Sequence, residues 1–174
     1  MRRILALFVC IILFIVPIHA ANAAPRVSTT AVVRENGTCQ VTIEADIRLD
    51  DPARGLKFPL GTDIKSVTLN GAPAPLSQSE GITSVNLSHL DGKVGLYTCT
   101  IAFEINSVVQ TDETEKQIVT VPLLYGFPYL VEDMSFQITM PSRFDTVPTF
   151  YSGYHGQDIE RQMSASISGS VIRG

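Results

Sequence analysis

Residues 38–49, TCQVTIEADIRL, alternate strictly between polar and apolar side chains. The odd-numbered positions from 39 to 49 are all apolar, and the even-numbered positions are all polar or charged. Successive side chains of a β-strand point to opposite faces, so this period of two predicts a half-buried strand. Asn36 and Gly37 precede the stretch and form a strong hairpin-turn signal, which pairs it with a strand over residues 27–33.

The same alternation recurs at residues 96–106 and 134–140. Shorter strands are predicted at residues 64–69, 82–87, 117–124, 147–151 and 161–171. Pro122 cannot donate to a strand ladder, so the run that contains it is expected at a sheet edge. The sequence shows no helical periodicity of useful length. Eight or nine short strands separated by turns predict a mainly β fold, an antiparallel β-sandwich.

The first residues have the three parts of a secretory signal peptide. Two arginines follow Met1, residues 4–16 form an unbroken apolar run, and residues 21–23, Ala-Asn-Ala, fit the small-x-small cleavage rule. The run is shorter than the roughly 20 residues that a membrane-spanning helix needs. We therefore expect residues 1–23 to be a cleaved signal peptide and residues 24–174 to be one exported, extracytoplasmic domain. An uncleaved N-terminal anchor is the alternative.

The charge balance excludes one class of partner. Without the signal peptide the 13 basic side chains fall to 11, against 17 acidic ones, a net charge of −6. These charges are scattered along the chain rather than gathered in blocks. Nucleic-acid binding needs a basic face, which the sequence does not provide.

Two cysteines, Cys39 and Cys99, remain after the signal peptide, and both fall on apolar strand faces. An even number of cysteines in an exported chain favours a disulfide. We expect a bridge between them, which would close a loop of 61 residues. Such a loop stabilises a fold by about 4 kcal/mol on the chain-entropy model. Two buried free thiols are the alternative.

The sequence offers no recognisable catalytic or metal-binding set. His89 stands alone, and His155 with Asp158 supplies two ligands where a zinc site needs three or four. No serine sits in a nucleophile elbow, and no glycine-rich loop could cradle a phosphate. We therefore expect no enzyme activity, no metal and no cofactor. A small hydrolase that uses His155 or Asp158 is the alternative.

Aromatic side chains form the suggestive clusters of this sequence. They lie in two glycine-containing stretches: Tyr125, Phe127 and Tyr129 in one, and Phe150, Tyr151 and Tyr154 in the other. Exposed aromatics in loops can form a binding face for a protein or a glycan. The alternative is that they cap the open ends of the sandwich, since large aromatics are mostly buried.

The last 80 or so residues carry a family resemblance. The motifs are FQITMP at residues 136–141, FYSGYHG at residues 150–156 and SGSVIRG at residues 168–174. This part resembles the N-terminal ectodomain of the YciQ-like predicted membrane proteins of bacteria, a domain of unknown function. The resemblance implies an extracytoplasmic β domain followed by transmembrane helices, and it supplies no catalytic residues. We expect the membrane to be reached through a C-terminal region that this sequence lacks.

The function expected from the sequence is that of a non-catalytic extracytoplasmic β domain of a membrane-associated envelope protein. Its partner would be another envelope protein or a glycan. The alternative is a secreted binding module that recognises a glycan or a protein through the aromatic loops.

Overall fold

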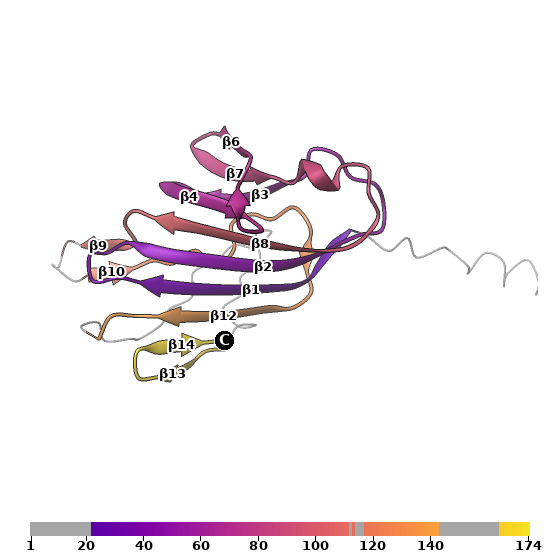
Figure 1. Ribbon diagram of the computed structural model, residues 1–174. Helices are drawn as coiled ribbons and strands as arrows, with labels where there is room; N and C mark the ends of the chain where they lie inside the picture. The colour runs from indigo at the N-terminus through magenta and orange to yellow at the C-terminus, as the bar shows by residue number, and fades with distance from the viewer. Residues whose placement is uncertain (1–21, 112, 114–116, 143–163) are drawn as a thin grey trace, which may run out of the picture.

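The computed structural model describes residues 22–111, 113, 117–142 and 164–174, and its regular structure is almost entirely β-strand (Figure 1). The predicted mainly β fold class is confirmed. The strands outnumber the eight or nine predicted, because several of them have only two or three residues, too few for an alternation to be visible in the sequence. The elements are β1 (Ala23–Val33), β2 (Cys39–Leu49), β3 (Lys57–Gly61), β4 (Ile64–Leu69), β5 (Ala72–Pro73), β6 (Leu76–Ser79), β7 (Ile82–Asn86), the 3-10 helix η1 (Ser88–Leu90), β8 (Gly95–Ile105), β9 (Val109–Thr111), β10 (Gln117–Val119), β11 (Leu130–Val131), β12 (Met134–Thr139), β13 (Ser166–Ser168) and β14 (Val171–Arg173).

Nine strands form the main sheet, in the order β13-β14-β12-β1-β2-β8-β4-β5, with β11 beside the start of β1. Its centre consists of β1, β2 and β8, each eleven residues long. Strands β2 and β8 pair over their whole length, from Cys39 opposite Ile105 to Leu49 opposite Gly95. The odd-numbered side chains of β2 are all buried, so the alternation correctly identified the core face.

Strand β1 has a neighbour on each side. It pairs antiparallel with β2, as the Asn36–Gly37 turn predicted. On its other edge it pairs in parallel with β12, from Val27 opposite Met134 to Val32 opposite Thr139. The main sheet is thus mainly antiparallel, as predicted, but the pairings of β1 with β11 and with β12 are parallel. An alternation of side chains predicts that a segment is a strand, but it does not say which strand lies beside it or in which direction.

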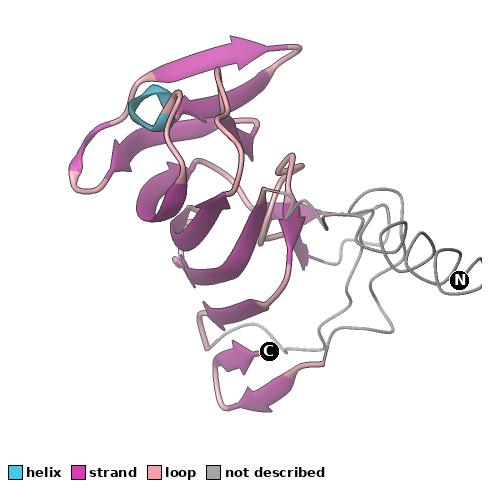
Figure 2. Cartoon of the chain, turned by 90° about the vertical axis from the view of Figure 1, so that its right-hand side faces the viewer, coloured by secondary structure: helices cyan, strands magenta, loops and turns pink. Residues whose placement is uncertain are grey.

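A second sheet of three strands, in the order β3-β7-β6, lies at the end of the main sheet where β4 is found (Figures 1 and 2). Its buried side chains Phe58, Leu60 and Val85 belong to the same apolar cluster as those of β2 and β8. The two sheets therefore share one core. Strands β9 and β10 form a separate hairpin.

The predicted disulfide is wrong, because Cys39 and Cys99 are both buried and both free. They lie on paired strands, but Cys39 is opposite Ile105 and Cys99 is opposite Ala45. Six positions of the ladder separate them, about 20 Å at roughly 3.3 Å per residue. A disulfide needs Cα atoms within about 7 Å. Burial raises the pKa of the Cys39 thiol to about 11 and also raises the pKa of Cys99, so both thiols are protonated near neutral pH.

Some sequence-based expectations fall on residues that the structure does not describe. These include the apolar run at residues 4–16 and the strand predicted at residues 147–151. No helix among the described residues is long and apolar enough to cross a membrane.

We expect neither thiol to react with reagents in solution while the protein is folded. Native protein treated at pH 8 with a thiol-specific alkylating reagent should remain unmodified at Cys39 and Cys99, because burial keeps each sulfur protonated and out of contact with the reagent. After denaturation in urea without any reductant, mass spectrometry should find one adduct on each. A loss of 2 Da that only a reductant reverses would show that the bridge forms after all.

Candidate functional site

The predicted aromatic loop at residues 125–129 places its three rings in three different environments. Phe127 is 1% exposed and packs against Phe58, with ring centroids 4.8 Å apart. Tyr129 is half-buried and meets Phe127 edge-on at 5.7 Å. Tyr125 is 41% exposed, and its ring lies over Gly61. Phe127 is thus a core residue rather than a binding residue, whereas Tyr125 and Tyr129 remain accessible.

The segment that carries these rings is held to the main sheet by hydrogen bonds. The hydroxyl of Thr29, which is completely buried in β1, donates to the carbonyl of Leu123 at 2.7 Å. Further along, the N–H of Glu132 donates to the carbonyl of Ala24 at 3.0 Å. Both ends of the segment are therefore fixed to β1, and its position relative to the small sheet is set.

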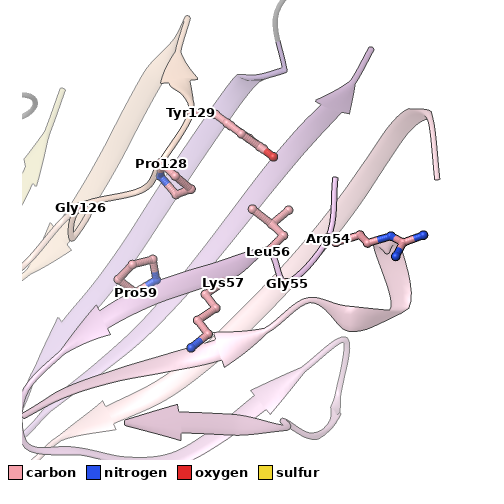
Figure 3. Close-up of a pocket in the computed structure, with 8 residues that line it drawn as sticks. All are labelled: Arg54, Gly55, Leu56, Lys57, Pro59, Gly126, Pro128 and Tyr129. Carbon is pink, nitrogen blue, oxygen red and sulfur yellow. The ribbon is translucent and has the colours of Figure 1, made fainter. Parts of the chain in front are cut away.

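A groove lies between this segment and the start of the small sheet (Figure 3). Its volume is about 380 Å³, within the roughly 300–1,000 Å³ of ligand clefts. Leu56, Pro59, Pro128 and Tyr129 give it a largely apolar lining. The full set of lining residues is Arg54, Gly55, Leu56, Lys57, Pro59, Gly126, Pro128 and Tyr129.

Two cations stand at the rim of the groove. The side chains of Arg54 and Lys57 are exposed and extend outward from its edge (Figure 3). Neither forms an ion pair with any residue in the described part of the chain, where the four ion pairs use Arg26, Arg34 and Arg48 instead. The rim therefore carries uncompensated positive charge on a protein whose net charge is negative.

The sequence contained a signal for half of this groove. Leu56, Phe58 and Leu60 are buried and alternate with Lys57 and Pro59, a period-two pattern that is typical of a strand. The proline in this run indicates an edge strand. This strand belongs to none of the aromatic clusters or candidate catalytic sets that the sequence suggests, so it was not predicted as part of a site.

Arg48 is the centre of the strongest charge cluster among the described residues. Its guanidinium donates to Glu132 at 2.7 Å and to Asp50 at 3.1 Å. These bonds, first the one to Glu132 and then the one to Asp50, raise the pKa of Arg48 above its ordinary value. All three groups already have partners within the protein, so the cluster fastens the turn after β11 to β2.

The remaining candidates give no second site in the described part of the chain. His89 is exposed in η1. Phe150, Tyr151, Tyr154, His155 and Asp158 lie outside the described residues. Within the described ranges, no group of three or more His, Cys, Asp or Glu side chains could hold a metal ion.

Comparison with known proteins identifies a similar fold but no family. No protein-family model and no curated protein matches the chain. Native leukotriene A4 hydrolase from Saccharomyces cerevisiae is similar at a TM-score of 0.52 and 14% identity, over 88% of this chain and 26% of that one. An M1 zinc metallopeptidase from Deinococcus radiodurans matches at 0.45 and 8% identity, over 88% of this chain and 38% of that one. The chain spans about a quarter of the length of the yeast enzyme, and at this identity the likeness shows a shared β fold alone.

The different environments of the aromatic rings can be separated by mutation. Phe127→Ala should lower the free energy of unfolding by about 3–5 kcal/mol, because it opens a cavity against Phe58. Tyr125→Ala should lower it by no more than about 1 kcal/mol, because that ring is largely exposed. Urea denaturation followed by circular dichroism measures both values. Equal losses for the two variants would contradict this assignment.

Proposed function

We propose that the chain is a non-catalytic extracytoplasmic β domain of a membrane-associated envelope protein, and that it acts by binding another protein. The groove between residues 54–59 and 126–129 is the observation that supports binding. Its lining is apolar, its rim carries two unpaired cations, and none of its lining side chains is a His, Cys, Asp, Glu or Ser. Such an apolar surface with a few polar groups at its rim is typical of a ligand-binding site.

The envelope location is supported by the sequence. The basic start, the apolar run at residues 4–16 and the small residues at 21–23 have the order of a signal peptide. The resemblance to YciQ-like ectodomains supports attachment to a membrane beyond the domain itself.

The location is tested in native cells with an antibody raised against residues 24–174. We expect the antigen in the membrane fraction, at an apparent mass above 18.9 kDa, and we expect protease added to intact spheroplasts to destroy it. A cytoplasmic antigen that resists added protease would overturn the proposal. A soluble antigen in the medium would instead support a secreted binding module.

A second candidate function follows from the fold comparison. The likeness to part of the yeast leukotriene A4 hydrolase supports a role as the β portion of a larger hydrolase, whose catalytic residues would lie elsewhere in the protein. The two candidates differ in what accompanies the domain. Immunopurified native protein should show hydrolase activity if the second is right, and should show none if the first is right.

A further inference from the structure

We propose that the free edge of β3 receives one additional strand from a partner protein, an extended segment in which apolar and acidic side chains alternate. This inference rests on the proposed binding function and names the chemistry of the partner. Recognition of this kind takes its affinity from main-chain hydrogen bonds and its specificity from alternate side chains.

Strand β3 has a partner on one edge only. The small sheet runs β3-β7-β6, so β7 covers one side of β3 and no strand in the described part of the chain covers the other. The N–H of Leu87 donates to the carbonyl of Leu56 at 2.9 Å, which makes these two residues a hydrogen-bonded pair. In an antiparallel ladder such pairs alternate with non-bonded ones. Phe58 therefore also bonds to β7, and the backbone groups of Lys57 and Pro59 point to the free edge.

The groove gives this edge a second wall. Pro128 and Tyr129 stand across from Leu56 and Pro59 (Figure 3). A strand added beside β3 would lie about 4.8 Å from it. Its side chains on the core side would then contact Leu56 and the ring of Tyr129, so apolar residues fit at these positions.

The opposite face of the added strand meets positive charge. Lys57 alternates with the buried residues of β3, so its side chain lies on the outer face of the small sheet. Cross-strand neighbours share a face, and opposite charges there stabilise a pair. Arg54 adds a second cation just before the strand. The nearby Asp91 accepts a hydrogen bond from the N–H of Gly55 at 2.9 Å and forms no ion pair with Arg54.

The other sheet edges lack this combination. Strand β5 has only two residues, one of them Pro73. Strand β13 is a Ser-Ile-Ser segment without a charged side chain, and strand β6 carries no cation. Among these edge strands of the described part of the chain, only β3 combines outward-pointing backbone groups with an apolar groove and unpaired positive charge.

The test follows hydrogen exchange at the Lys57 amide of native protein purified from cells. The probe is a ten-residue peptide of alternating valine and glutamate, and the control peptide alternates valine and lysine. Without peptide the Lys57 amide should exchange quickly, since it faces solvent. Saturating valine–glutamate peptide should slow its exchange at least tenfold, whereas the control peptide should have no effect.

Two matched pairs of variants separate the contribution of the Lys57 charge to peptide binding from that of the Lys57 backbone N–H. Lys57→Glu should weaken peptide binding at least tenfold, and Lys65→Glu, the same change on the exposed face of β4, should not. Lys57→Pro removes the outward N–H but leaves the bonds of Leu56 and Phe58 to β7 intact, so it should weaken binding further than Lys57→Ala. Circular dichroism checks that each variant is folded.

The proposal is overturned if the Lys57 amide is already protected without peptide, or if the peptide binds Lys57→Pro as tightly as Lys57→Ala. Binding that is lost in Tyr129→Ala but never protects the Lys57 amide would also overturn it, and would indicate a glycan or another ligand on the ring. None of these results depends on where the protein resides in the cell. A failure here is therefore distinct from a failure of the envelope proposal, which cell fractionation decides.

Discussion

The hydrogen bond from the buried Thr29 hydroxyl to the Leu123 carbonyl joins the centre of the main sheet to the segment that shapes the groove. A polar group buried in the middle of a strand is costly unless it has a partner, so this contact fixes where the segment crosses the core. Phe127 then packs against Phe58, and its neighbours Gly126, Pro128 and Tyr129 line the groove. The groove thus depends on packing between three parts of the chain that are far apart in sequence.

Local patterning predicted the elements that lie at the centre of the fold. The alternations in residues 38–49 and 96–106 correspond to β2 and β8, and the Asn36–Gly37 turn correctly paired β1 with β2. The parallel neighbour of β1 was not predictable, because a parallel pair needs no turn between its strands and leaves no local signal. The cysteines were misjudged for a related reason. Their shared face was visible in the sequence, but their six-position offset depends on the register between two strands.

The candidate site was the part least accessible from sequence. The aromatic pattern identified residues 125–129 as important, yet it could not distinguish Phe127, which packs on Phe58, from Tyr125, which does not. The opposite wall consists of Arg54, Gly55, Leu56, Lys57 and Pro59, residue types that are common in any surface segment. Its significance comes from being the uncovered edge of a sheet, and that property belongs to the topology rather than to any residue type.

The parallel pairing of β1 with β12 has a consequence for the order in which the protein can fold. Strands β1, β2 and β8 can form an antiparallel unit as soon as residue 105 has been synthesised. Most of the outer edge of β1, from Val27 to Val32, stays unpaired until Met134 and the residues after it have emerged. Contacts between residues so far apart in sequence form slowly. Strand edges that are still unpaired during this time promote aggregation. The slow step of folding should therefore be the closure of this edge.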